Sequence, residues 1–131
     1  MKLAEAKRLM ARQVKERQAQ AVLVDFLNLA LPRGSLVRAV PGGDGKVTTA
    51  PGYVSGTGDI LLLIRMPGDQ HFWIMPVFFE TKRPVGGRRS PEQIIEQQTC
   101  RAAGVPYEFV RTVEEATAAL LHLGVSLRVP K

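Results

Sequence analysis

The sequence predicts a single α/β domain over residues 1–131, in which a mixed central sheet is flanked by helices. Two apolar runs, residues 60–64 and 77–79, are continuous enough to form strands that are buried on both faces. Helical periodicity precedes these runs, and two helix-start signals follow them at Ser90 and Thr112. This order of elements is typical of a layered α/β domain, and 131 residues suffice for one core but not for two.

Composition narrows the class of protein to which the chain can belong. Charges recur through the N-terminal segment and no apolar run is long enough to cross a bilayer, so we expect a cytoplasmic protein. The one cysteine, Cys100, excludes an internal disulfide and a cysteine-based metal site. The net charge of +6 and the pI near 10.0 favour a polyanionic partner, although many basic proteins bind no nucleic acid.

The first predicted element is a long helix over residues 1–31. Its apolar residues at helical spacing include Leu3, Val22, Leu23 and Leu27. Residues 1–15 are rich in lysine and arginine and form a basic helical extension. Two interpretations stay open for cations such as Arg12: a solvated helical face, or an arm that lies along a phosphate backbone.

Glu16 is an acid at the edge of the apolar stripe of this helix. At about 100° per residue it lines up with Leu23 and Leu27, so it points toward the body of the protein more than an average surface glutamate does. The alternative is a surface glutamate that pairs with Arg12 or Gln20.

A short strand over residues 36–40 and a turn-rich loop over residues 41–55 follow the helix. The loop contains Lys46 beside several glycines, and it either tracks a DNA backbone or serves as a flexible connection. Gly56 and Gly58 then permit a tight turn and a close approach of the backbone to a substrate.

The next two strands are predicted to pair as a hairpin. Residues 66–70 form a turn sequence, so the strand that ends at Ile64 and the strand that starts near Phe72 should run antiparallel. Pro76 indicates a bulge or an edge position in the second strand, because proline cannot donate a ladder hydrogen bond.

Three ionisable residues lie at the ends of these strands: Asp59 opens the first, and Glu80 and Lys82 close the second. Side chains alternate along a strand, so Glu80 and Lys82 share one face, and pairing of the strands can bring Asp59 close to Glu80. Two carboxylates and an ammonium are costly to desolvate together, and a divalent cation would offset the repulsion. The alternative is an exposed salt bridge at the strand end.

A basic loop and a helix follow the second strand. The loop leaves the strand that carries the acid and the lysine, so its arginines are candidates for contacts with nucleic-acid phosphates: Arg83, Arg88 and Arg89. Ser90 and Gln93 form a capping box at the start of the helix, and Gly104 ends it. The rest of the chain is predicted to form a strand over residues 105–110, a helix over residues 112–123, and a tail over residues 124–131 that adds an edge strand or makes a subunit contact.

The order of these motifs resembles that of the VRR-NUC (virus-type replication-repair nuclease) branch of the PD-(D/E)XK nuclease superfamily. The resemblance covers about residues 16–123 and rests on Gly-Thr-Gly-Asp at 56–59, Glu-Thr-Lys at 80–82 and Ser-Pro-Glu-Gln at 90–93. Glu-x-Lys alone is a weak signal, but the ordered set is far more specific. The family often has asparagine where this chain has Gly42, so a role for that loop does not carry over. The fold that the resemblance implies is a restriction-endonuclease-like α/β/α sandwich.

The resemblance also implies a metal site for Mg²⁺ or Mn²⁺, which are hard cations that take oxygen ligands. The implied ligands are Asp59, Glu80, the main-chain carbonyl of Thr81 and, directly or through water, Glu16. Lys82 would orient the attacking water and offset negative charge on the phosphorus. Gln93 would face the catalytic centre, which is an alternative or an addition to its capping role.

The implied reaction is phosphodiester hydrolysis by a DNA endonuclease that is specific for branched structures such as Holliday junctions or flaps and that acts in DNA repair. Symmetric cutting of a junction needs two active sites, so we expect a homodimer. A bacterial or phage-infected cell is the setting that the family implies. Two other classes stay open: a non-catalytic nucleic-acid-binding module, for which basic charge suffices, and a small interaction protein.

Overall fold

The structure is a computed structural model that describes residues 3–40, 56–82 and 88–128, without the side chains of residues 5–17. Its helices and strands follow the predicted order: α1 (Leu3–Ala30), β1 (Leu36–Ala39), β2 (Ile60–Met66), β3 (Trp73–Thr81), α2 (Pro91–Ala102), β4 (Tyr107–Val110) and α3 (Val113–His122).

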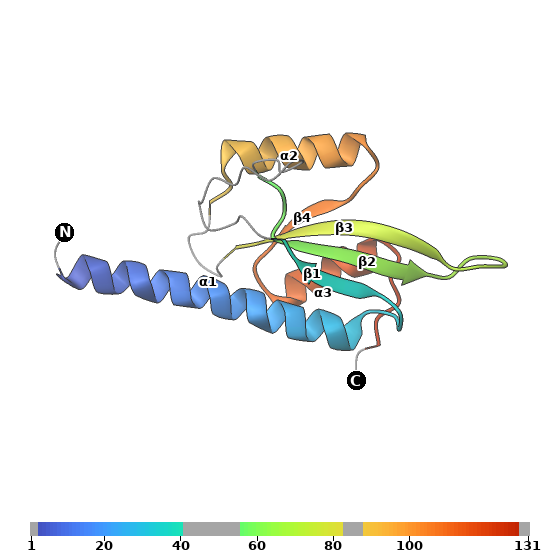
Figure 1. The fold of residues 1–131 in the computed structure, drawn as a ribbon, viewed down its shortest axis with the longest axis horizontal. Helices are drawn as coiled ribbons and strands as arrows, with labels where there is room; N and C mark the ends of the chain where they lie inside the picture. The colour runs from blue at the N-terminus through green and yellow to red at the C-terminus, as the bar shows by residue number, and fades with distance from the viewer. Residues whose placement is uncertain (1–2, 41–55, 83–87, 129–131) are drawn as a thin grey trace.

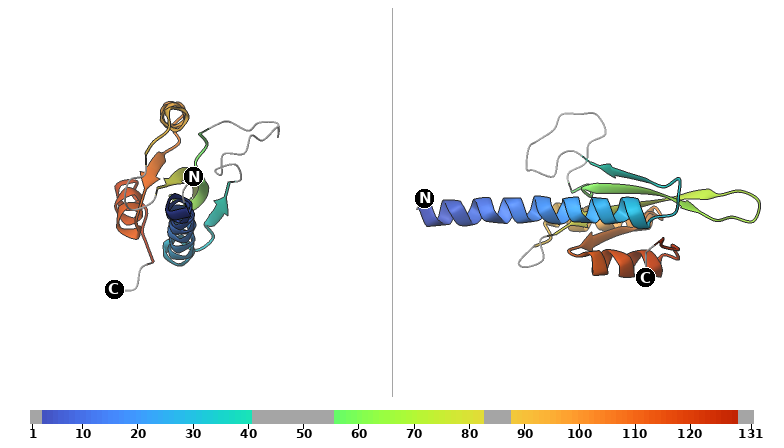
Figure 2. Two further views of the ribbon diagram at one scale, coloured as in Figure 1. Left: turned by 90° about the vertical axis from the view of Figure 1, so that its left-hand side faces the viewer. Right: turned by 90° about the horizontal axis from the view of Figure 1, so that it is seen from below.

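The strands of the described residues form one mixed sheet in the order β1-β2-β3-β4. The β1–β2 and β2–β3 pairs are antiparallel, and the β3–β4 pair is parallel. Parallel neighbours need a crossover connection, which α2 provides between β3 and β4. Helix α2 covers one face of the sheet, and α1 and α3 lie on the other (Figures 1 and 2). The predicted α/β architecture of a mixed sheet between helices is therefore confirmed.

β2 and β3 form the predicted antiparallel hairpin, with an unbroken register from Ile60↔Phe79 to Met66↔Trp73. The register has no bulge at Pro76, so the edge interpretation of this proline is the correct one. β4 pairs with β3 only from Phe78 onward, and the Phe78 amide donates to the Pro106 carbonyl on that side. The Pro76 nitrogen faces the same side two residues earlier, where the described residues provide no neighbouring strand.

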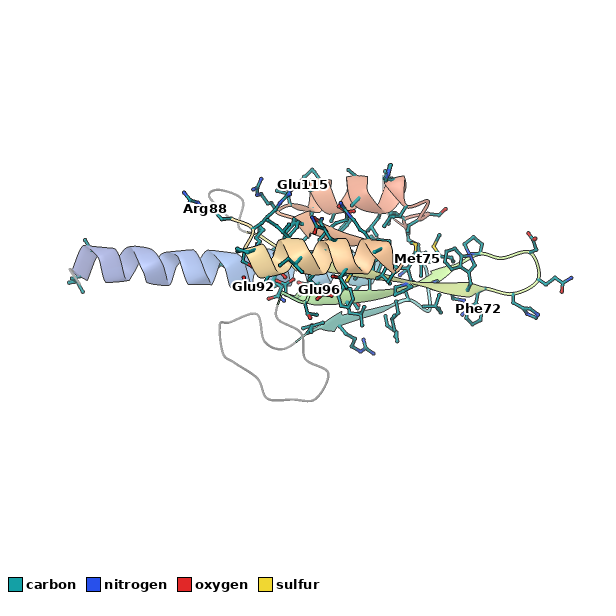
Figure 3. All side chains as sticks on the ribbon, turned by 90° about the horizontal axis from the view of Figure 1, so that it is seen from above. Phe72, Met75, Arg88, Glu92, Glu96 and Glu115 are labelled. Atoms are coloured by element: carbon teal, nitrogen blue, oxygen red, sulfur yellow. The ribbon has the colours of Figure 1, made fainter. Side chains whose placement is uncertain are left out.

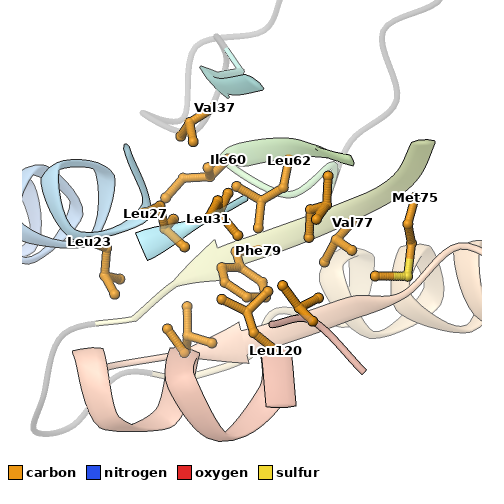
Figure 4. Packing of buried hydrophobic residues seen from close by; sticks show 14 of the residues in the cluster. Leu23, Leu27, Leu31, Val37, Ile60, Leu62, Met75, Val77, Phe79 and Leu120 are labelled. Carbon is orange, nitrogen blue, oxygen red and sulfur yellow. The ribbon is translucent and has the colours of Figure 1, made fainter. Parts of the chain in front are cut away.

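The hydrophobic core lies between the sheet and the helices α1 and α3 (Figure 4). Alternate residues of the two central strands point into it and are fully buried: Ile60, Leu62, Ile64, Val77 and Phe79. The core receives Leu23 and Leu27 from α1, Leu31 from just beyond its end, and Ala116 and Leu120 from α3. Burial of each large apolar side chain contributes about 1.5–3 kcal/mol to folding, and it fixes which residues of β2 and β3 face away from this core, Glu80 among them.

Helix α1 is continuous from Leu3 to Ala30, so the basic extension over residues 1–15 is part of a longer helix where it is described. The C-terminal half of α1 packs on the core through residues such as Leu23 and Leu27, and the backbone of its N-terminal half runs past the sheet (Figure 1). The predicted apolar stripe is wrong at Leu3 and Val22, which are 72% and 56% exposed. Leu3 is at the start of α1, in the half that runs past the sheet, whereas Val22 adjoins the fully buried Leu23 and lies on another side of the helix.

The C-terminal tail adds no strand within the described residues 124–128. Instead the Arg128 amide donates to the Ala30 carbonyl, and Arg128 Nε donates to the Leu31 carbonyl, each at 2.6 Å. These bonds satisfy carbonyl groups at the C-terminal end of α1 and hold the C-terminal end of the described chain against that helix.

No helix in the described part of the chain is long and apolar enough to cross a membrane.

Candidate active site

The hairpin register places Asp59 and Glu80 next to each other. One residue beyond the Ile60↔Phe79 pair, the same register puts Asp59 opposite Glu80, on the face of the sheet that carries α2. The Asp59 amide donates to Glu80 Oε2 at 3.0 Å. Core burial of Ile60 and Phe79 turns their sequence neighbours to the opposite face, so the hydrophobic pattern of the two strands positions the two acids.

Thr81 holds the Asp59 carboxylate from the neighbouring strand. The Thr81 amide and the Thr81 hydroxyl both donate to Asp59 Oδ1, at 3.0 and 3.1 Å. Both donors converge on one oxygen of the carboxylate, so Thr81 fixes Oδ1 and does not engage Oδ2. The Thr81 side chain was not among the predicted contacts, because only its main-chain carbonyl follows from the family resemblance.

Glu80 is buried, with 7% of its surface exposed, and both of its carboxylate oxygens have partners. Oε2 accepts the Asp59 amide, and Oε1 accepts Gln93 Nε2 at 2.7 Å. Lys82 Nζ lies 3.7 Å from the same Oε1. Glu80 and Lys82 therefore project to one face of β3, as strand alternation predicts, and the strand end is interior rather than exposed.

Gln93 makes both of the contacts that its position in the sequence allowed. Its Oε1 accepts the Ser90 amide at 3.0 Å, which completes the capping box of α2. The same Oε1 accepts Lys82 Nζ at 2.7 Å, while Nε2 donates to Glu80. One amide group therefore links the first turn of α2 to the acid and to the lysine of β3.

Burial shifts both acids toward the protonated form. Burial raises the pKa of Asp59 to about 6, although hydrogen bonds from Thr81 and the charge of Lys82 oppose the rise. Burial and then the negative charge of Asp59 raise the pKa of Glu80 to about 7. Without further positive charge, this pair therefore takes up protons close to neutral pH.

Two glycines bring the loop before β2 against α2 and β3. Gly56 has φ +88°, and a Cβ atom there would collide with the Glu92 carbonyl in the first turn of α2. A Cβ atom on Gly58 would lie 3.1 Å from the Phe79 carbonyl oxygen. Tyr107 Oη donates to the Gly56 carbonyl at 2.7 Å and holds the loop from β4. The glycines of the Gly-Thr-Gly-Asp motif thus allow the close packing that seats Asp59.

Phe109 of β4 is a neighbour of the site that sequence reasoning did not identify. It pairs with Glu80 in the parallel register, and its ring centroid lies 5.9 Å from Lys82 Nζ and 4.6 Å from Arg89 Cζ. The ring also packs edge-on against Tyr107, with centroids 5.5 Å apart. The alternation of β4 could have revealed Phe109 only if the strand beside β3 had been known.

The remaining predicted residues are divided between described and undescribed parts of the chain. Arg88 and Arg89 are exposed at the start of α2, and Figure 3 shows Arg88 beyond the end of the helix. Lys46 and Arg83 lie outside the described residues. Glu16 and Arg12 have helical backbone in α1, and their side chains lie outside the description.

The described residues supply two carboxylates at this place, and nowhere do they gather three or more His, Cys, Asp or Glu side chains suited to a metal ion. Oxygen donors in a half-buried setting with raised pKa values fit a hard divalent cation, because such a cation replaces the protons that the pair otherwise binds. Asp59 and Glu80 would hold it.

Comparison with known proteins found no matching family model, no matching curated protein and no matching solved structure.

Proposed function

We propose that the protein is a divalent-metal-dependent nuclease that hydrolyses phosphodiester bonds in DNA, with a VRR-NUC type of site on a restriction-endonuclease-like fold. The observation that carries the proposal is the meeting of Asp59, Glu80 and Lys82 at one end of a strand pair. The two acids have raised pKa values, and the ammonium lies 3.7 Å from one of them. A strand-end salt bridge needs only one acid and one base, and it gives no reason for a second buried carboxylate.

The chemistry that a bound Mg²⁺ or Mn²⁺ supplies is polarisation of a phosphate oxygen and a lower pKa for a coordinated water. The residues of the chain then have separate tasks. Thr81 fixes Asp59 Oδ1 and leaves Oδ2 available, and the Asp59 amide fixes Glu80 Oε2. Hydrolysis forms a bond between phosphorus and the water oxygen, and it breaks the bond to one deoxyribose oxygen, which takes up a proton.

Lys82 would stabilise the negative charge that grows on the phosphate oxygens during this step. Its ammonium is held in place by Gln93 Oε1 at 2.7 Å, so little reorganisation is needed as the charge develops. Gln93 in turn is fixed by its bond from the Ser90 amide. The lysine is thus oriented by a side chain that the start of α2 holds in one conformation.

The finer expectations from the family resemblance belong to the same proposal. They are action on branched DNA such as a Holliday junction or flap, a role in DNA repair, a homodimer with two active sites, and a bacterial or phage-infected cell as the setting. The net charge of +6 supports a polyanionic substrate, and this charge is equally consistent with a non-catalytic DNA-binding module.

A cleavage assay on labelled DNAs tests the proposal. The panel contains a four-way junction, a flap, a splayed arm, a duplex and a single strand, each with Mg²⁺, Mn²⁺ or EDTA. We expect metal-dependent cutting that Glu80→Ala abolishes and that Glu114→Ala retains, because Glu114 is an exposed carboxylate on α3, on the other face of the sheet. DNA binding without cutting of any substrate would contradict the nuclease and favour the binding module.

A further inference from the structure

Two arginines of equal charge stand next to each other at the start of α2, and only one of them has a fixed place. The Arg89 guanidinium lies over the Phe109 ring, 4.6 Å from its centroid. For the Arg88 side chain the described residues provide no hydrogen bond, ion pair or ring contact, and Figure 3 shows it directed away from the body of the protein. The aromatic ring therefore distinguishes one arginine from its neighbour.

The ring that holds Arg89 belongs to the surroundings of the candidate active site. Phe109 is the parallel partner of Glu80, and Lys82 Nζ lies 5.9 Å from the same ring centroid. Arg89 and Lys82 thus both lie close to the ring of Phe109. Tyr107 supports the ring from within the sheet, since it is fully buried and packs edge-on against it.

We propose that Arg89, held on Phe109, forms a binding subsite for the phosphate next to the one that is cleaved. The inference rests on the proposed nuclease function and narrows its substrate to a polynucleotide strand, because a subsite of this kind needs a second phosphate. Lys82 is already bonded to Gln93 and lies beside Glu80, so it serves the reacting phosphate and leaves Arg89 for a neighbour.

A guanidinium that lies over the face of an aromatic ring keeps its N–H donors in its own plane, so they point outward from the edge and are not covered by the ring. These donors match two oxygens of one phosphate, and stacking removes part of the rotamer freedom that a free arginine loses on binding. Lysine cannot replace this geometry, because an ammonium is a point charge without a planar fork. Phe109 is therefore a positioning residue, and Arg89 is the group that contacts the substrate.

Among the residues that the structure describes, the Arg89 side chain contacts the Phe109 ring, and the rest of this side chain is exposed. A structural role in the fold would require a bond from its guanidinium to the main chain or to an acid. Arg101 shows that arrangement in the same protein, with bonds to both carboxylate oxygens of Glu108. Arg89 lacks such a bond among the described residues, so its cation is available for a ligand.

A double-mutant cycle on DNA binding tests the subsite. The probe is a fluorescent 20-nucleotide strand, alone and in duplex, titrated in EDTA so that no cleavage occurs. We expect Arg89→Ala and Phe109→Leu each to weaken binding by roughly two- to five-fold. The double variant should bind no worse than Arg89→Ala alone. Arg88→Ala should have the same effect in the wild-type and Phe109→Leu backgrounds.

Two conservative variants separate positioning from packing. Phe109→Tyr keeps a ring under the guanidinium and should bind DNA as the wild type does, whereas Arg89→Lys should resemble Arg89→Ala. If Phe109→Leu does not fold, as judged by its circular dichroism and thermal transition, Phe109→Met takes its place in the cycle.

Additive effects of Arg89→Ala and Phe109→Leu, or equal coupling of Phe109 to both arginines, would overturn the subsite. The proposed nuclease activity is tested separately, by cleavage with the wild type in Mn²⁺ and with Glu80→Ala as the control. Cleavage together with additive effects in the cycle would refute only the subsite. Coupled effects without any cleavage would refute only the nuclease activity, and absence of DNA binding would refute the subsite.

Discussion

Replacement of Glu80 by glutamine should change how the stability of the protein depends on pH. The pKa of Glu80 rises from 4.5 to about 7 on folding, because burial and the Asp59 charge disfavour its ionised form. Between these pH values the native state binds more protons than the unfolded state, so stability falls as pH rises. At about 1.4 kcal/mol for each pKa unit, the full loss is about 3 kcal/mol.

The Glu80→Gln variant has no proton to lose, so it should lack this part of the pH dependence. Its amide resembles the protonated acid in shape, but an amide NH₂ group cannot accept the hydrogen bonds that the Gln93 amide and the Asp59 main-chain amide donate to the two Glu80 oxygens. A mismatched hydrogen bond costs about 1 kcal/mol. We therefore expect the variant to be about as stable as the wild type at pH 5, where the carboxyl of the unfolded wild type is already mostly ionised, and more stable by about 2 kcal/mol at pH 8.

Urea unfolding in EDTA at pH 5, 6, 7 and 8 measures this difference. Asp59 titrates in both proteins, so its contribution should largely cancel in the comparison. Glu114→Gln, at an exposed carboxylate in the first turn of α3, is the matched control and should follow the wild type. Addition of Mg²⁺ at pH 8 should stabilise the wild type, by about 1.4 kcal/mol at ten times the dissociation constant, and not Glu80→Gln. Parallel pH profiles for the wild type and Glu80→Gln would refute the reasoning that a buried charge resides at Glu80.

Three further predictions follow from the same contacts. Lys82→Ala should abolish cleavage and leave DNA affinity nearly intact, because its charge is needed mainly as the phosphate charge grows; unchanged single-turnover cleavage would contradict the site. Gln93→Ala should lower the melting temperature, through loss of about 1 kcal/mol of capping energy, and should also reduce the cleavage rate; loss of stability alone would limit Gln93 to a cap. Gly56→Ala should destabilise the fold by at least about 2 kcal/mol more than Gly104→Ala. Both glycines have positive φ, but only Gly56 has the Glu92 backbone where the methyl group would lie. Equal melting temperatures for these two variants would show that the close approach is absent.

The proximity of Asp59 and Glu80 could be predicted because it depends on short-range features. A hairpin turn fixes the register of its two strands, and the apolar pattern fixes which side chains face the core. Both features are local to residues 59–80, so the sequence alone contained the information. The helix starts at Ser90 and Thr112 were predictable for the same reason, since a cap is a contact over three residues.

Phe109 and the hydroxyl bond of Thr81 could not be predicted in this way. The place of Phe109 depends on a parallel pairing between strands that are separated by α2, and no local signal sets the register of such a crossover. The Thr81 hydroxyl reaches Asp59 across a strand pair, although alternation alone directs it to the face opposite Glu80. The exposed Val22 is an error of a similar kind, because how far around α1 the buried stripe extends depends on what packs beside the helix in the whole fold.

Pro76 also affects how the protein behaves at high concentration. The outer side of β3 between Trp73 and Val77 has no paired strand in the described residues, and Ile74 and Trp73 are 42% and 49% exposed there. An open, apolar strand edge is a template for pairing with another chain and for aggregation. The amide direction at Phe78 puts only the nitrogens of Ile74 and Pro76 on the open side of this stretch, and proline has no hydrogen to donate. A strand from another chain could therefore accept only one main-chain hydrogen bond from this stretch, that of the Ile74 amide. The proline thus weakens the open edge of the hairpin as a template for strand pairing and aggregation.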